Sequence, residues 1–254
     1  MNEIILPILQ TFEAISLSEM DSVALMDRTD TKYALREEML PSFLKVLNSS
    51  YRVLEVNDHR ISRYESLYFD TANFNLYHNH RRERLNRFKI RYRTYVESNL
   101  HFFEVKFKNN KGRTVKQRIP HDRDEKIDGE AKIFFQNNFT INPESLENKL
   151  KVHFSRITLV NKFAPERVTI DLHLSFINKV QDHLIKNLII AEVKQGKPFV
   201  SPFVRLMKNY HVRVGGISKY CFGVMTLYPE QPFNNFKPEL IQLKKIIYDA
   251  AARA

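Results

Sequence analysis

The chain has 254 residues, with 40 lysines and arginines against 29 aspartates and glutamates, so its formal net charge at pH 7 is +11. This excess predicts an acidic partner such as nucleic acid, an anionic membrane or phosphates. The single cysteine, Cys221, excludes an intramolecular disulfide and a cysteine-rich zinc site. No apolar run approaches the roughly 20 residues that span a bilayer, and the N-terminus lacks the pattern of a secretory signal. We therefore expect no transmembrane segment and a cytoplasmic location.

Hydrophobic periodicity predicts an alternation of helices and strands along the chain. In the first half we predict one or two short helices in 1–26, a strand at 28–35, a helix at 37–48, strands at 51–56 and 63–70, and a helix at 73–81. A meander of strands follows at 87–96, 100–108 and 113–120. Helices are then predicted at 128–138 and 143–150, strands at 152–161, 166–176 and 187–194, and helices at 201–209, 218–227 and 236–252.

No low-complexity linker, repeat or block of like charge divides the chain, so we expect one domain over residues 1–254. The N-terminal helices in 1–26 and the C-terminal helix at 236–252 are expected to pack on it. Many strands in antiparallel-looking succession, together with several helices, indicate an α+β domain built around a barrel.

Basic residues recur at every second position along several predicted strands. In the strand at 87–96, apolar side chains alternate with the cations Arg87, Lys89, Arg91 and Arg93. Because a strand projects successive side chains to opposite faces, such a segment has one charged face and one apolar face. The strands at 100–108, 113–120 and 187–194 repeat the pattern. This indicates a sheet with helices on its apolar side and a shared cavity, suited to a polyanion, on its charged side.

Two similar units, Glu104-Val105-Lys106 and Glu192-Val193-Lys194, place an acid and a base on one face of a strand. Each unit is either a structural ion pair or a site where the carboxylate holds Mg²⁺ or Mn²⁺ while the lysine contacts a phosphate. Glu192 is the stronger candidate because it follows the apolar run Leu188-Ile189-Ile190-Ala191, and a carboxylate in such a run needs a partner. For Asp171 we favour the role of counter-ion to an arginine over that of a second metal ligand.

The usual nucleotide-binding and hydrolytic motifs are missing. The sequence contains no G-x-x-x-x-G-K-[ST], no G-x-G-x-x-G and no H-E-x-x-H. With no evident nucleophile, the chemistry indicated is positioning plus charge neutralisation, as in phosphoryl transfer. Arg91 and Arg93 offer planar forks of donors suited to phosphate oxygens, and Ser218 is a candidate cap for a helix whose first N–H groups face an anion.

Six short motifs, in order along residues 20–228, resemble the VTC domain, the catalytic core of a polyphosphate polymerase in the triphosphate tunnel metalloenzyme (CYTH-like) superfamily. They are Thr31-Lys32-Tyr33, Leu67-Tyr68-Phe69-Asp70-Thr71, Lys89-Ile90-Arg91-Tyr92-Arg93, Glu104-Val105-Lys106, Ala191-Glu192-Val193-Lys194 and Ser218-Lys219-Tyr220. The compact chain resembles the stand-alone bacterial members of this family.

The resemblance implies an antiparallel β-barrel tunnel of about eight strands surrounded by helices. It implies that the catalytic residues are Arg91, Arg93, Lys106, Arg156, Arg167 and Lys194. It also implies that phosphates are bound by Lys32, Arg91, Arg93, Lys106, Lys116, Arg156, Arg167, Lys194, Ser218 and Lys219. Glu192 is expected to hold the metal, Mn²⁺ or Mg²⁺.

The leading functional hypothesis is a metal-dependent polymerase that moves the γ-phosphoryl group of ATP onto polyphosphate, with inorganic phosphate or pyrophosphate as a possible primer. A second hypothesis is a triphosphatase or short-chain polyphosphate hydrolase that uses the same site with water as nucleophile. A third is a non-catalytic module that binds polyanions such as RNA. Nucleic acid is the weaker partner, because Phe88, Tyr92 and Phe107 lie opposite the charges and not among them.

Overall fold

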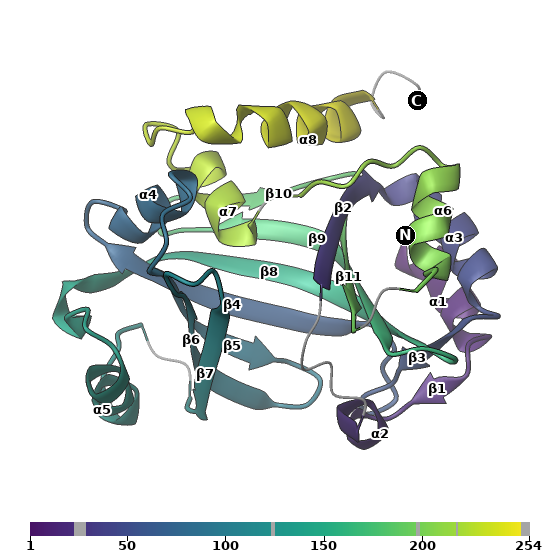
Figure 1. Cartoon of the computed structure of the whole chain (residues 1–254), viewed down its shortest axis with the longest axis horizontal. Helices are drawn as coiled ribbons and strands as arrows, with labels where there is room; N and C mark the ends of the chain where they lie inside the picture. Colours follow the sequence, from purple (N-terminus) through teal and green to yellow (C-terminus); the bar gives the residue numbers. More distant parts are fainter. Residues whose placement is uncertain (23–28, 123–124, 197–198, 217, 250–254) are drawn as a thin grey trace.

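A single curved antiparallel sheet forms the centre of the molecule, and helices cover its outer face and one end of its inner face (Figure 1). This is a computed structural model, and it describes residues 1–22, 29–122, 125–196, 199–216 and 218–249. In spatial order the main strands are β2 (Thr29–Arg36), β11 (Leu188–Gln195), β9 (Glu166–Ile177), β8 (Leu146–Asn161), β4 (Ser62–Thr71), β5 (Arg87–Tyr95), β6 (Leu100–Lys108) and β7 (Thr114–Pro120).

Three short strands extend this sheet. The sequence did not predict β1 (Ala14–Ile15), which pairs in parallel with β3 (Tyr51–Leu54), and β3 in turn pairs with β8. The other unpredicted strand, β10 (Asp182–Leu184), forms a hairpin with β9. The predicted α+β class and the antiparallel sheet are confirmed.

The predicted closed barrel is not found. Among the described residues, β2 and β7 stand at opposite ends of the strand path and do not pair with each other. The chain before helix α7 (Lys219–Leu227) lies across this opening instead. The N–H of Gly215 donates to the carbonyl of Lys32 on β2 (2.9 Å), and Nζ of Lys89 on β5 donates to Oγ of Ser218 (2.9 Å). These two contacts connect the start of α7 to β2 and to β5.

The prediction of a helix at 143–150 is wrong. Residues Pro143–Ser145 form a single 3₁₀ turn, and β8 begins directly after it at Leu146. The four-residue spacing of Leu146 and Leu150 fits a helix, but both residues also belong to one face of a strand. β8 extends this far because it pairs along the whole length of β4, from Ser62↔Arg156 to Thr71↔Leu146.

The other helices agree with the sequence to within a few residues. They are α1 (Asn2–Gln10), α2 (Leu17–Ser22), α3 (Leu40–Leu47), α4 (Asn75–Arg81), α5 (Gly129–Asn138), α6 (Pro202–Asn209), α7 and α8 (Lys237–Asp249). Residues 23–26 and 250–252 of the predicted terminal helices, and residue 28 of the first predicted strand, lie outside the described residues. Within the described part of the chain, none of these helices is both long enough and apolar enough to cross a bilayer.

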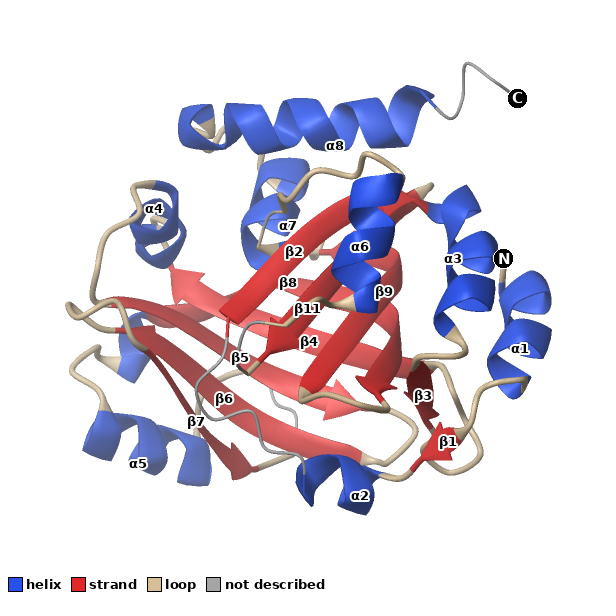
Figure 2. Ribbon diagram, turned by 45° about the vertical axis from the view of Figure 1, so that its right-hand side comes forward, coloured by secondary structure: helices blue, strands red, loops and turns tan. Residues whose placement is uncertain are grey.

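Each face of the sheet has its own hydrophobic cluster. Helices α1, α3 and α6 cover the outer face of β2, β11 and β9, around Tyr33, Ile170 and Ile189 (Figure 2). Helix α5 covers the outer face of β5 and β6 around Tyr92 and Phe103. The opposite, concave face carries a third apolar cluster at the end where α7 and α8 pack. The rest of the concave face is free to carry the charged residues.

Helix α7 fits closely against the apolar end of the concave face because it carries Gly223 at the contact. A Cβ atom at this position would lie 2.8 Å from Cδ1 of Leu150 on β8 and 2.8 Å from Cδ1 of Phe176 on β9. The missing side chain therefore sets how deeply α7 enters the curve of the sheet, and with it the position of Ser218 and Lys219.

We predict that Gly223→Val displaces α7 and destabilises the protein by about 1–3 kcal/mol, the usual effect of overpacking a filled core. Thermal unfolding measures the change, expected as a fall in Tm of several degrees. Thr226→Val, which places the same side chain at a half-buried position of the same helix, is the control and should change Tm much less. A Gly223→Val protein as stable as the unmodified chain would contradict the close fit.

Candidate functional site

The concave face of the sheet encloses a cavity of about 620 Å³. Its lining comes chiefly from β2, β4–β9, β11 and the start of α7, with smaller parts from α2 and β3, and most of its charged residues are cations. Every residue that the sequence predicted for phosphate or metal binding lines it: Lys32, Arg91, Arg93, Lys106, Lys116, Arg156, Arg167, Glu192, Lys194, Ser218 and Lys219. The predicted convergence of these side chains is thus observed, while their roles in binding and catalysis stay predictions.

The two-residue period of the strands brings these side chains together. On β5, Arg91 and Arg93 face the cavity, whereas Ile90 and Tyr92 are buried beneath α5. The strand register then sets the neighbours across the sheet, because Arg91 lies opposite Glu104 on β6. Of the eight main strands, all but β4 contribute at least one charged side chain to the lining, and β4 contributes serine and tyrosine.

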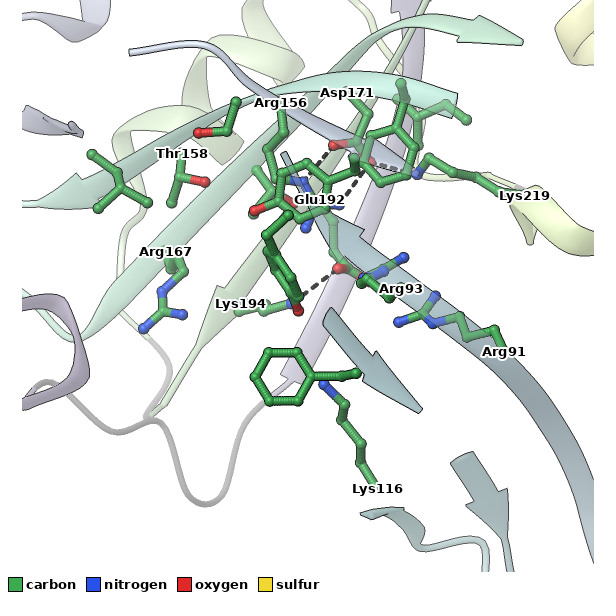
Figure 3. A pocket seen from close by; sticks show the side chains of 18 of the residues that line it. Arg91, Arg93, Lys116, Arg156, Thr158, Arg167, Asp171, Glu192, Lys194 and Lys219 are labelled. Carbon is green, nitrogen blue, oxygen red and sulfur yellow. Dashed lines mark hydrogen bonds and ion pairs between the residues drawn. The ribbon is translucent and has the colours of Figure 1, made fainter. Parts of the chain in front are cut away.

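Asp171 on β9 is the counter-ion that the sequence favoured. Its carboxylate accepts hydrogen bonds from Nε of Arg156 (2.6 Å) and Nη2 of the same guanidinium (2.8 Å), and from Nζ of Lys219 (Figure 3). Burial alone would raise the pKa of Asp171, but the charges of Arg156 and Lys219 outweigh it and hold the pKa well below its usual value. Asp171 therefore stays ionised and joins β8 to the start of α7.

Glu104 on β6 plays the same part at the other side of the cavity. Its side chain has no exposed area; it accepts from Nε and Nη2 of Arg91 (2.9 and 2.6 Å) and forms an ion pair with Lys116 (2.5 Å). The charges of Arg91, Arg93 and Lys116 outweigh the effect of burial and lower the pKa of Glu104 far below its usual value. Glu104 is thus a structural counter-ion, but its partners are Arg91 and Lys116, and the ion pair with Lys106 within the Glu104-Val105-Lys106 unit is not formed.

Glu192 on β11 lies between Lys32 and Lys194, at 3.2 Å from each. Burial would raise the pKa of Glu192, but these two lysines lower it to about 2. Its side chain is 21% exposed, compared with 0% for Glu104 and 4% for Asp171. Glu192 is therefore the most accessible of these three carboxylates.

The donor set fits a divalent cation held jointly by the protein and a substrate. Within the described part of the chain, no three histidine, cysteine, aspartate or glutamate side chains gather into a ready-made metal site. Mg²⁺ and Mn²⁺ are commonly bound through one or two carboxylates plus substrate phosphates and water. Glu192 could supply that one carboxylate, since Lys32 and Lys194 are free to turn to a phosphate.

Lys89, Arg93 and Lys106 on the concave face have no carboxylate within ion-pair distance among the described residues. The guanidinium of Arg93 donates from Nε to Oγ of Ser66 (3.1 Å) and lies against the rings of Tyr64 and Phe154. Lys89 donates only to the hydroxyl of Ser218. Lys106 has no hydrogen bond or ion pair in the described structure.

The pKa values of these three groups reflect their crowding. The pKa of Lys106 is well below its usual value, chiefly because of the charge of Arg91, then burial and the charge of Arg93. Burial is the main cause that lowers the pKa of Lys89 and of Arg93. An anion placed between them would remove this repulsion, so the cluster of Lys89, Arg93 and Lys106, here called the open cation cluster, is the best candidate for the main phosphate-binding position.

Sequence reasoning left several lining residues out of the predicted site. The alternation placed Lys89 on the charged face of its strand, and that signal could have included it. Tyr68, whose hydroxyl accepts a hydrogen bond from Nη1 of Arg91 (2.8 Å), gave no such signal. Phe102 and Arg118 also line the cavity. An aromatic residue at an inward position can be recognised only once the strand register is known.

Comparison with known proteins gives the family. The model of the VTC domain matches residues 27–228. The chain belongs to the VTC domain family. This confirms the resemblance drawn from the six motifs. A comparison with curated proteins finds no match.

Several solved structures are similar to this VTC domain. A candidate adenylate cyclase from Vibrio parahaemolyticus is 14% identical, with a TM-score of 0.46, over 77% of this chain and 97% of that one. One from Bacillus halodurans is 13% identical, with a TM-score of 0.48, over 76% and 96%. A candidate adenylyl cyclase from Hippeastrum, described as having a dominant triphosphatase activity, is 11% identical, with a TM-score of 0.48, over 78% and 95%.

We predict that affinity for tripolyphosphate falls as the pH rises above neutrality, already at pH values where an ordinary lysine keeps its proton. The pKa of Lys106 is lowered in the free protein, so Lys106 loses its proton well before an ordinary lysine, and only the charged form attracts phosphate. One linked proton gives at most about a tenfold loss per pH unit. Lys106→Arg should flatten the profile, because a guanidinium stays charged over this range. Titration calorimetry at several pH values measures both profiles, and equal slopes would contradict the assignment.

Proposed function

We propose that this VTC domain protein is a polyphosphate polymerase that transfers the γ-phosphoryl group of ATP onto a growing polyphosphate chain inside the cavity. The observation that carries the proposal is the open cation cluster, in which Lys89, Arg93 and Lys106 line one cavity and none of them forms an ion pair with a carboxylate in the described structure. Such a cluster suits several consecutive phosphates better than one isolated anion. Membership of the VTC domain family supports the same activity.

The reaction needs no side-chain nucleophile. A terminal oxygen of the polyphosphate chain attacks the γ-phosphorus, the bond from that phosphorus to the β,γ-bridging oxygen breaks, and ADP leaves with the electron pair. Arg93 and Lys106 would stabilise the negative charge that develops on the transferred group. Arg91 and Arg156, fixed by Glu104 and Asp171, would hold the reacting phosphates in line.

Glu192 would hold Mn²⁺ or Mg²⁺ together with the substrate phosphates. When bound, the cation supplies charge neutralisation at the β- and γ-phosphate oxygens. Lys32 and Lys194, which now contact Glu192, would turn to the phosphates. Inorganic phosphate or pyrophosphate is proposed as primer, because either presents the same terminal oxygen as the chain. We also propose a cytoplasmic location, which the single buried thiol of Cys221 supports.

A triphosphatase is the second candidate, and two hydroxyl groups favour it. Thr158 and Thr169 line the cavity on β8 and β9, and Oγ1 of Thr169 is buried without a hydrogen-bond partner in the described structure. Such a hydroxyl could orient a water molecule toward a bound phosphate. The same cations would then serve hydrolysis, with water in place of the chain end.

The products distinguish the two candidates. Purified protein incubated with ATP and Mn²⁺ should give long polyphosphate chains on a gel, with one ADP for each phosphate added. Release of orthophosphate alone, without chains at any ATP concentration, would contradict the polymerase and support the triphosphatase.

We predict that Glu192→Gln lowers kcat by at least about a hundredfold while leaving the binding of tripolyphosphate in place. The substitution removes the carboxylate proposed for the metal but none of the cations. The control is Glu38→Gln, which removes an ion-paired carboxylate (Arg36, 2.8 Å) that does not line the cavity. Steady-state turnover and calorimetric binding measure the two effects. Turnover that survives Glu192→Gln would refute the metal role.

A further inference from the structure

One end of the cavity has a different chemistry from its centre. There apolar and aromatic side chains gather, namely Leu17, Leu54, Val56, Tyr95, Leu100 and Phe102, next to Ser98 and to Glu97, whose carboxylate is paired with Arg63. They come from α2, from the end of β3 and the turn after it, and from the β5–β6 hairpin. Leu100 remains 47% exposed, so this surface is not completed by the described chain. Phosphates gain nothing from such a lining, so this end suits another part of a ligand.

Arg118 lies over the ring of Phe102 at this end. The guanidinium carbon of Arg118 on β7 lies 4.2 Å from the centre of the Phe102 ring on β6, and the ring of Tyr95 meets Phe102 edge-on at 5.9 Å. Arg118 has no carboxylate within ion-pair distance in the described structure. Planar guanidinium groups and aromatic rings are the surfaces on which nucleobases stack.

This pair of residues adjoins the open cation cluster. Phe102 lies directly across from Arg93 in the β5–β6 register, so an unpaired guanidinium stands beside the ring. Phe102, Glu104 and Lys106 face the cavity in succession along β6. Four residues of strand separate Phe102 from Lys106, about 13 Å. A ligand with a flat group at one end and several phosphates at the other would span this distance along one strand.

We propose that this end of the cavity, here called the base platform (Phe102, Arg118 and Tyr95), binds the nucleobase of a nucleoside triphosphate. Its triphosphate then passes Arg93 and reaches Lys106. The proposal rests on the proposed function, because it places the donor nucleotide of that reaction. Stacking uses the π-face common to all bases, so the platform favours nucleotides over bare phosphate chains and discriminates little between one base and another.

The test compares two ligands that share a triphosphate and differ in the base. Titration calorimetry in the presence of Mg²⁺ measures the affinities of the β,γ-imido analogue of ATP and of diimidotriphosphate, neither of which turns over. Phe102→Leu keeps the charge of the site and removes the ring. It should lower the affinity for the nucleotide analogue about 5- to 100-fold, the range that base stacking contributes. The affinity for diimidotriphosphate should change by less than about twofold.

Phe107→Leu is the matched control, since Phe107 lies on the same strand but stacks on Phe88 (4.5 Å) on the other face. It should leave the ratio of the two affinities unchanged. Equal effects of Phe102→Leu on both ligands, or no effect on either, would overturn the base platform. If the unmodified protein binds diimidotriphosphate as tightly as the nucleotide analogue, the base platform is contradicted and the phosphate-binding site is not. If it binds neither ligand, the proposed function itself is contradicted.

Discussion

The structure depends on how positive charges are kept together on one concave face. Three carboxylates each lie between two cations: Glu104 between Arg91 and Lys116, Asp171 between Arg156 and Lys219, and Glu192 between Lys32 and Lys194. An unpaired buried charge is costly by several kcal/mol, so these contacts make the arrangement tolerable. Each carboxylate neutralises the charge of one of its two cationic partners, so the site keeps a net positive charge. The same contacts join β5 to β7, β8 to α7, and β11 to β2.

Helix α7 connects the charged cavity to the apolar end of the concave face. Its apolar side packs on the concave face around Gly223, and its first residue, Lys219, reaches Asp171. Tyr220 donates a hydrogen bond to Asp70 (2.5 Å), whose carboxylate also accepts from the first N–H groups of α4. Because α7 is held from both sides, Ser218 and Lys219 are positioned before any ligand arrives, which lowers the entropy that binding must overcome.

Local patterns in the sequence predicted the charged faces, because the two-residue period of a strand requires no knowledge of its partners. The pairing of Glu104 and Asp171 with specific cations depends on register between strands far apart in the chain, and local patterns do not contain it. The same limit explains the error at Leu146, where the decisive partner is the distant strand β4. The alternation along its strand was enough to place Lys89 on the charged face. Phe102 can be identified as a candidate binding residue only once its neighbours Arg93 and Arg118 on adjacent strands are known.

The central claim is that cations on the concave face, and not those on the exterior, bind the phosphates. A crystal structure of the protein with a non-hydrolysable triphosphate tests it most directly. The account predicts phosphate oxygens within hydrogen-bond distance of Arg93 and of Nζ of Lys106. Ligand bound only on the outer surface, or a cavity that stays empty at saturating concentration, would contradict it.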